Sequence, residues 1–198
     1  MLKLLQLSEK KNTEVKTVPF NDIEENNWYY DSVEYVYSRG MMKGMDDSHF
    51  GPSETTTRGM IITILYRMEG EPSVSGNAFA DVKSDMYYAA AINWAVENGI
   101  VKGYGDGIFG PEDSITREQL SNILMNYAEY KGADVTARAD LSNFCDALQA
   151  SSWAEASLAW ANAEGLIQGN PDSTINPGGN AERAQAAAIL ARFDKKIK

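Results

Sequence analysis

Three arginines, Arg58, Arg117 and Arg183, recur at the predicted starts of three helices. The clearest of these starts has Thr116 as its cap and Gln119 three residues later, which is the spacing of a capping box. A cation in the first turn opposes the helix dipole, at a cost of about 0.3–1 kcal/mol. Because this unfavourable placement is made three times, the sequence indicates a compensating partner for each guanidinium group.

Two kinds of partner would compensate these charges. One is an internal ion pair with an acid that comes early in each repeated stretch, namely Asp22, Asp81 or Asp146. The other is an anion from outside the protein, held by the guanidinium group together with free N–H groups of the helix N-terminus. The residues by themselves favour the internal pair, since structural ion pairs are the commoner use of such charges.

Aromatic residues occupy a second recurring position, at the start of the preceding helix, as Trp28, Tyr87 and Trp153. Flat rings with a polar edge suit the stacking of sugar rings, and core filling is the alternative use. For these three positions the sequence favours neither sugar stacking nor core filling. For Trp94 and Trp160, which fall in the middle of a predicted helix, core filling is favoured.

Glycine loops form the third recurring feature and contain Gly44, Gly103 and Gly169. A glycine lets the backbone approach a ligand closely, although a tight turn alone would also explain it. The loop after Gly103 does not fit a calcium site of the EF-hand type. Ile108 and Gly110 stand where oxygen ligands should recur.

The elements that position these residues occur three times in the chain. Phe20-Asn-Asp-Ile returns 59 residues later as Phe79-Ala-Asp-Val, and the two copies then align without a gap over some forty positions. A third copy follows at a spacing of 66 residues. It is degenerate, because its opening Phe144-Cys-Asp fits only when one residue of spacing is shifted.

Each copy is predicted to contain two helices joined by a Gly/Asp/Pro loop. The first helix is led by an aromatic residue and is expected over residues 28–38, 86–98 and 153–164. A glycine in the left-handed conformation should close each of them, at Gly40, Gly99 and Gly165. The second helix should begin near Thr57, Thr116 or Ala181.

The second helix carries an apolar stripe, formed in copy two by Leu120, Ile123, Leu124 and Tyr127. One helix pair cannot bury its stripe alone, so the three stripes are expected to meet on a common axis. The fold class that follows is mainly α, a pseudo-threefold helical module of three helix–loop–helix repeats. An open solenoid is the rival arrangement.

Composition excludes several classes of protein. The 198 residues carry a formal net charge of −10, which disfavours nucleic acid as a partner. No apolar stretch approaches the ~20 residues needed for membrane insertion, and Met1–Gln6 is too short for a signal-peptide core. With one cysteine and one histidine, no disulfide framework, multi-histidine metal site or other cofactor is expected.

An enzyme is not expected either, and no catalytic residue is assigned. Cys145 and His49 could form a nucleophile and base, but neither recurs in the other copies. A carboxylate pair for glycoside hydrolysis stays open, because an acidic chain offers many carboxylates.

Taken together, the recurring residues resemble the S-layer homology repeat. The resemblance rests on Phe79-x-Asp-Val with an aromatic eight residues after the phenylalanine, on the glycine-rich stretch 99–111, and on Ile115-Thr-Arg-Glu. Three tandem copies, over 20–68, 79–130 and 144–193, follow an N-terminal extension over 1–19 and are expected to form one compact module.

The resemblance implies a module that anchors surface proteins non-covalently to a bacterial cell wall, and so an extracellular location. The implied ligand is a secondary cell-wall polysaccharide, commonly with a pyruvylated amino sugar, and other surface-layer proteins are possible partners. The ligand-binding residues that it implies are Arg58, Arg117 and Arg183; Asp22, Asp81 and Asp146; Trp28, Tyr87 and Trp153; and Gly44, Gly103 and Gly169.

Departures from the family pattern weaken one copy more than the others. Copy three lacks the threonine and the final acid of the motif, and its loop has Asn170-Pro171 instead of an aromatic residue and glycine. We therefore expect the ligand groove to involve copies one and two. A protein-assembly module and a wall-active hydrolase are the alternative functions.

Overall fold

The computed structural model describes residues 18–197. This part of the chain is mainly α and contains no strand beyond isolated bridges. The first helices of the three copies are α1 (Tyr30–Ser38), α3 (Ala89–Glu97) and α5 (Glu155–Ala163), and a short 3-10 helix, η1 (Ala147–Gln149), precedes α5. The second helices are α2 (Arg58–Met68), α4 (Arg117–Tyr130) and α6 (Arg183–Lys196).

Two expectations concern the chain outside these helices. The N-terminal extension predicted over 1–19 lies, except for its last two residues, outside the described residues. Within residues 18–197, no helix combines the length and the hydropathy that a bilayer crossing requires.

The first helices end as predicted but begin later than predicted. Gly40, Gly99 and Gly165 follow them with φ of 69°, 70° and 67°, the left-handed conformation that closes a helix. Each helix begins two or three residues after the expected start. The residues before it are held in turns, such as the one closed by the Ala89 N–H to the Met86 carbonyl at 3.0 Å, rather than in α-helical bonds.

The second helices begin at the recurring arginines. Thr57 caps α2 by accepting the N–H of Met60 at 3.2 Å. The capping box predicted for α4 is confirmed, with Thr116 and Gln119 bonded in both directions. In copy three the helix starts after Glu182, whose side chain makes no cap, two residues beyond the expected Ala181.

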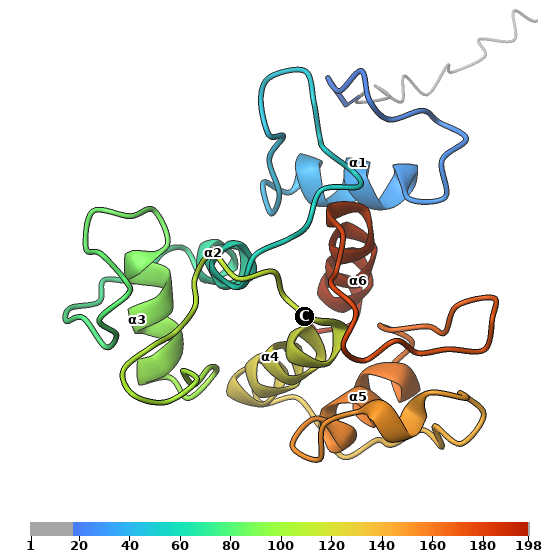
Figure 1. Ribbon diagram of the computed structural model, residues 1–198. Helices are drawn as coiled ribbons and strands as arrows, with labels where there is room; N and C mark the ends of the chain where they lie inside the picture. Colours follow the sequence, from blue (N-terminus) through green and yellow to red (C-terminus); the bar gives the residue numbers. More distant parts are fainter. Residues whose placement is uncertain (1–17, 198) are drawn as a thin grey trace, which may run out of the picture.

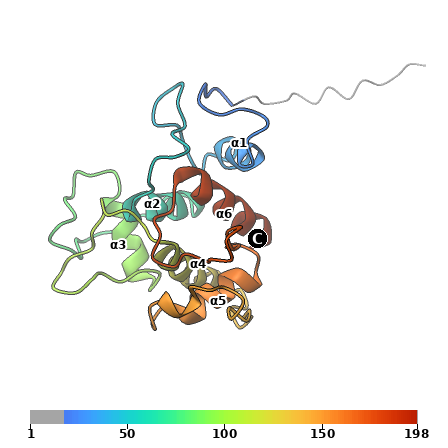
Figure 2. The same ribbon diagram turned by 45° about the vertical axis from the view of Figure 1, so that its right-hand side comes forward.

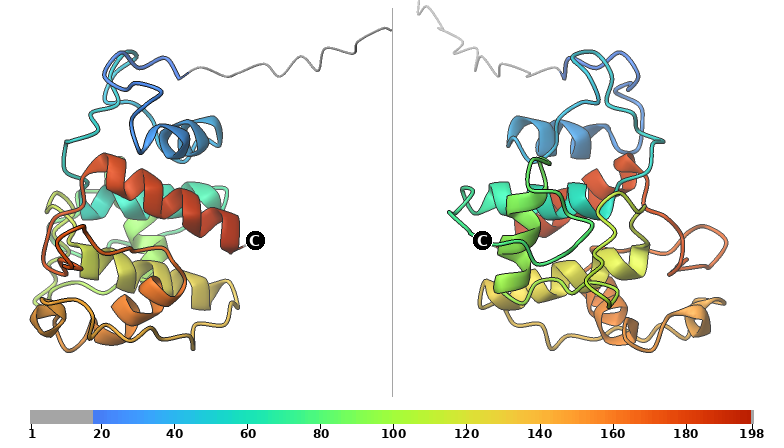
Figure 3. Two further views of the ribbon diagram at one scale, coloured as in Figure 1. Left: turned by 90° about the vertical axis from the view of Figure 1, so that its right-hand side faces the viewer. Right: turned by 60° about the vertical axis from the view of Figure 1, so that its left-hand side comes forward.

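The packing pairs of helices cross the boundaries between copies. Helix α3 packs on α2, α5 packs on α4, and α1 packs on α6. The second helices therefore lie around the centre of the molecule and the first helices lie outside them (Figure 1). Figures 2 and 3 show the same contact of α1 with α6 from other sides. This contact joins the first copy to the last, so the module is a closed ring and not an open solenoid.

Three main-chain hydrogen bonds form a cycle at the centre of the ring. Thr56 donates to Ala181 at 2.9 Å, Ala181 donates to Ile115 at 2.9 Å, and Ile115 donates to Thr56 at 2.8 Å. These residues are equivalent in the three copies, and all of them are buried. The cycle marks the pseudo-threefold axis.

The apolar stripes of the second helices meet around this axis in one core, as predicted. The stripe residues of α4 and their equivalents on α2 and α6 are buried, except Met68 at the end of α2, which is half-buried. The rings of Tyr127 on α4 and Phe193 on α6 lie 5.7 Å apart. Trp94 and Trp160 are also core residues, the use favoured for them from sequence.

Candidate ligand grooves

Each recurring arginine extends from its own copy into the loop of the next copy. Arg58 donates from Nε to the carbonyl of Phe109 at 3.1 Å and from Nη2 to the carbonyl of Lys102 at 3.3 Å. The other two arginines make the equivalent pair of bonds at 2.6–2.9 Å, Arg117 to Ile175 and Gln168, and Arg183 to Phe50 and Lys43. The guanidinium groups thus lock neighbouring copies together.

None of these three arginines forms an ion pair with an acid of the described residues. The hypothesis of an internal pair with an early aspartate is therefore wrong for this part of the chain. Carbonyl oxygens bind the guanidinium groups without cancelling their charge, and Nη1 of each group has no hydrogen-bond partner among residues 18–197. Burial lowers the pKa of all three, yet guanidinium groups stay charged at neutral pH.

The N–H groups at the starts of the second helices are not free, which corrects the second hypothesis. In α2, the N–H of Arg58 donates to Asp113 at 3.0 Å and that of Gly59 donates to Pro111 at 2.9 Å. The first two N–H groups of α4 and α6 bond in the same way to the loop of the next copy. An anion at these sites would meet the guanidinium group, but it would not share the first two N–H groups of the helix.

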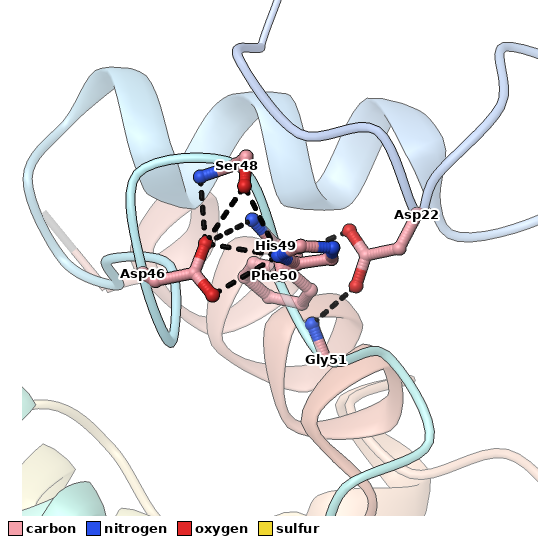
Figure 4. A network of polar contacts seen from close by, with 6 residues as sticks. All are labelled: Asp22, Asp46, Ser48, His49, Phe50 and Gly51. Carbon is pink, nitrogen blue, oxygen red and sulfur yellow. Dashed lines mark hydrogen bonds and ion pairs between the residues drawn. The ribbon is translucent and has the colours of Figure 1, made fainter.

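The early aspartates hold the same loops from within their own copies. Both oxygens of Asp81 accept backbone N–H groups, from Phe109 at 2.9 Å and from Gly110 at 2.7 Å. Figure 4 shows the equivalent contacts of Asp22 with Phe50 and Gly51. Burial alone would raise the pKa of Asp81, but these hydrogen bonds outweigh it and hold the pKa below its ordinary value.

Asp146 makes the equivalent bonds to Ile175 and Asn176, at 2.8 and 2.7 Å, so the shifted spacing of copy three preserves the contact. None of the three aspartates lines a groove described below. Their direct part in ligand binding stays a prediction.

Gly44, Gly103 and Gly169 line the grooves, but a packing contact explains why these positions require glycine. A Cβ at Gly103 would overlap the ring of Phe79 and the carbonyl of Ile108. The other two glycines meet the first phenylalanine of their own copies in the same way. None of the three has a positive φ. Glycine is therefore required because a side chain would not fit, and not because the backbone is left-handed.

Three surface grooves surround the ring, and each draws on all three copies. The preceding copy supplies the arginine, the groove's own copy supplies the glycine loop and the second helix, and the following copy supplies an exposed aromatic side chain. The expected groove involving copies one and two corresponds to the one lined by Arg58 and Gly103, to which copy three adds Trp153. We name each groove after the copy that supplies its glycine loop.

The grooves share this plan but differ in size. The first groove is lined by Arg183, Gly44 and Tyr87 and has a volume of about 300 Å³. The second groove is lined by Arg58, Gly103 and Trp153 and has a volume of about 590 Å³. The third groove is lined by Arg117, Gly169 and Trp28 and has a volume of about 190 Å³.

The aromatic side chains at the groove edges are exposed. Trp28 is 66% exposed, Tyr87 is 54% exposed and Trp153 is 55% exposed. Large exposed rings beside a polar groove are typical of ligand-binding surfaces rather than cores. The structure thus brings nine of the twelve residues implied by the resemblance to the grooves, while the three aspartates lie behind the loops.

One groove-lining position was missed in the sequence. Arg67, Asn126 and Arg192 occupy equivalent places on α2, α4 and α6. They follow by three residues the equivalent isoleucines Ile64, Ile123 and Ile189. The only available signal was the spacing between copies, since the residue type changes from copy to copy. It became visible once the fold placed this helix face beside the arginine of the preceding copy.

The residues considered for catalysis or metal binding do not form a site. Residues 18–197 contain no group of three side chains suited to hold a metal ion. His49 Nδ1 lies 3.0 Å from Asp46 (Figure 4), and the Ser48 backbone and the His49 ring lower the pKa of Asp46 to about 2. Cys145 is an exposed free thiol in a different copy.

Comparison with known proteins follows the same three copies. Residues 19–59, 78–121 and 144–187 match the family model described as the S-layer homology domain. Among curated relatives, the Exoglucanase XynX of Acetivibrio thermocellus is 38% identical over 88% of the chain, and the Amylopullulanase of Thermoanaerobacterium thermosulfurigenes is 38% identical over 86%. The Surface-layer 125 kDa protein of Lysinibacillus sphaericus is 32% identical over 89%.

The match covers only a small part of each relative. It spans 16%, 9% and 15% of these three proteins, in the order given. Two of the three carry enzyme names, and the similarity lies in a small region that they share with a surface-layer protein. The enzyme names therefore assign no catalytic activity to this chain.

Proposed function

Because the chain belongs to the S-layer homology domain family, we propose that it anchors to the bacterial cell wall by binding an anionic wall polysaccharide in the three grooves. Cell-surface anchoring is supported by the family and by the surface-layer relative. The polysaccharide, its negative charge and the grooves as its binding site are the proposal.

The observation that carries this proposal is the state of the three arginines. Each guanidinium group is buried at the wall of a groove and is bonded to carbonyl oxygens, and no acid of residues 18–197 forms an ion pair with it. An exposed aromatic ring lies in the same groove. A cation next to a flat ring suits a sugar that carries a carboxylate, since the ring stacks on the sugar while Nη1 donates to the acid.

Attraction between the chain and this ligand must be short-ranged. The net charge of −10 repels an anion at long distance, and salt screens exposed charges beyond about 8 Å at physiological ionic strength. The arginine contact acts inside a groove, where screening is weaker. A pyruvate ketal on an N-acetylated amino sugar fits this chemistry, because it places one carboxylate on an otherwise neutral ring.

The test measures retention of the chain on purified secondary wall polysaccharide, before and after the ketal groups are removed. The exposed rings offer variants that preserve the core, so Trp28→Ala, Tyr87→Ala and Trp153→Ala are compared with Leu148→Ala, which is fully exposed and lines none of the three grooves. We expect the ring variants to reduce retention and the Leu148 variant to leave it unchanged.

The arginine is tested with a check on folding. Arg117→Ala should weaken binding by about 1.5–3 kcal/mol, the worth of a charge-assisted hydrogen bond. Its helix content and unfolding midpoint must be measured in parallel, because Arg117 also holds the loop of copy three. Full retention by this variant and by the three ring variants would refute the groove proposal. Full retention of the wild type on walls stripped of the polymer would favour a protein partner.

A further inference from the structure

The three grooves differ at one equivalent position of the second helix, where Arg67, Asn126 and Arg192 stand. In the second groove, Asn126 Nδ2 donates to the carbonyl of Ile100 at 3.0 Å. In the third groove, Arg192 Nη1 donates to the equivalent carbonyl, that of Leu166, also at 3.0 Å. An amide and a guanidinium group thus occupy the same place in two otherwise related grooves.

The third groove therefore contains two guanidinium groups, from Arg117 and Arg192, and no carboxylate lines it. Neither arginine has an acid partner among the described residues. Burial lowers the pKa of Arg117; the negative charge of Asp146 raises it, and the positive charge of Arg192 lowers it. Gln185, which lines the same groove, has its amide oxygen buried without a hydrogen-bond partner in the described chain. Two like charges held together in this way would be stabilised by an anion between them.

The other two grooves offset their charge in different ways. In the first groove, Arg67 pairs with Glu71 at 3.8 Å. In the second groove, the carbon of the Arg58 guanidinium lies 4.5 Å from the ring centres of both Tyr104 and Phe109. Aromatic faces attract the cation and cover it.

Copy three lacks these rings, since it has Asn170 and Ile175 at the equivalent positions. No aromatic ring stacks on Arg117 among residues 18–197. The departure that suggested a weak copy-three site thus leaves its guanidinium group without the aromatic ring that lies over Arg58 and Arg183.

The polar lining of the second groove is otherwise mostly neutral. The side chain of Lys102 is exposed to solvent and its carbonyl is bonded to Arg58. The helix that forms the floor contributes three amides, from Gln119, Asn122 and Asn126. Amides recognise hydroxyl and acetamido groups of neutral sugars.

The grooves also differ in the size of ligand that they admit. At about 590 Å³ the second groove falls in the usual range of small-molecule sites, roughly 300–1,000 Å³. The third groove, at about 190 Å³, lies below this range and suits one compact group.

We propose that the third groove selects a carboxylate-bearing sugar residue, held between Arg117 and Arg192, while the second groove binds charged and uncharged sugar residues about equally well. This inference rests on the proposed function, because it divides the glycan of that function between two grooves. The position occupied by Arg192 and Asn126 decides the charge preference.

The chain carries its own reporters for the test. Of its four tryptophans, Trp28 lines the third groove and Trp153 lines the second, whereas Trp94 and Trp160 are buried at 3% and 0% exposure. The four indole N–H signals in a nitrogen–proton NMR spectrum therefore distinguish the two grooves and provide two internal references. The probes are the methyl glycoside of an N-acetylated amino sugar carrying a pyruvate ketal and the methyl ester of the same compound, which has a similar shape without the charge.

We expect the acid to shift the Trp28 signal and the ester to shift it only at concentrations at least about tenfold higher. The Trp153 signal should respond to both probes within about a factor of three. Arg192→Asn should remove the preference at Trp28, and it retains a donor for the Leu166 carbonyl as Asn126 does for Ile100. Asn126→Arg should create a preference for the acid at Trp153.

The opposite results overturn the inference. Equal responses of Trp28 to acid and ester, an unchanged preference in Arg192→Asn, or no response of either indole would each refute it. Retention on wall polysaccharide is measured separately with the same protein. If the chain binds the polymer but Trp28 shows no preference, the division of the grooves is wrong and the anchoring function stands. If Trp28 prefers the acid but the polymer is not retained, the anchoring proposal fails and the anion site stands.

Discussion

Removing one carboxylate should show that the early aspartates are structural links of the ring. Asp81 accepts the N–H groups of Phe109 and Gly110, and the carbonyl of the same Phe109 accepts Nε of Arg58. One loop residue thus joins the acid of copy two to the arginine of copy one. We predict that Asp81→Ala destabilises the whole module and not only its own loop.

The size of the effect follows from the two hydrogen bonds that are lost. Phe109 and Gly110 are buried, so their N–H groups would lose their acceptor without gaining full access to water. Each buried donor left unpaired costs about 1–3 kcal/mol, which gives about 2–6 kcal/mol for the pair. Folded domains have a total free energy of unfolding of about 5–15 kcal/mol. Asp81→Asn keeps one acceptor oxygen and should cost about half as much.

The assay is urea unfolding followed by far-ultraviolet circular dichroism. Asp85→Ala is the matched control, because Asp85 is an exposed acid of the same copy. We expect the control to change the free energy of unfolding by less than about 0.5 kcal/mol. A loss in Asp81→Ala no larger than in the control would show that the loop does not depend on this carboxylate.

Three further predictions follow from the same geometry. The pKa of Asp81 is below its ordinary value in the folded chain. The contribution of its carboxylate to stability is therefore present above about pH 4 and is lost as the pH falls through the lowered pKa. The free energies of unfolding of wild type and Asp81→Ala should accordingly converge at low pH. Gly103→Ala should lower the free energy of unfolding by more than about 1 kcal/mol in urea titrations, because the added methyl group overlaps the Phe79 ring. Thr116→Ala should cost about 0.5–2 kcal/mol by the same measurement, since it removes the oxygen that accepts the Gln119 N–H; an unchanged midpoint in either variant would contradict its reasoning.

Local patterns in the sequence were enough to predict most of the helical fold. The stripe from Leu120 to Tyr127 identified the buried face of α4, and Thr116 with Gln119 identified its start. Both signals lie within one or two helical turns. The pairing of α1 with α6 could not be read in this way, because it joins the two ends of the chain through contacts that carry no local spacing. Repetition suggested closure, but only the structure shows that each packing pair spans two copies.

The candidate site was predicted less completely than the fold. The recurring arginines were identified because their place at a helix start is unfavourable, yet their carbonyl partners lie in the next copy and have no side-chain signature. The carbonyl groups of Pro111 and Asp113 accept the first two N–H groups of α2. Because these are backbone contacts, no side chain in the sequence indicated that the helix N-terminus is already hydrogen-bonded. Arg192 was missed because the sequence search looked for residues that recur in the copies, whereas Arg192 matters because it differs from the equivalent Asn126.

The cycle of hydrogen bonds between Thr56, Ile115 and Ala181 has a consequence for how such a molecule could grow. Each member gives one bond and receives one, so a ring with one unit fewer or one unit more would have to be rebuilt at its axis. Duplication of a single unit therefore cannot lengthen this architecture step by step. More binding grooves therefore require another complete module of three repeats, because the central hydrogen-bond cycle fixes the number of repeats, and so of grooves, in each module.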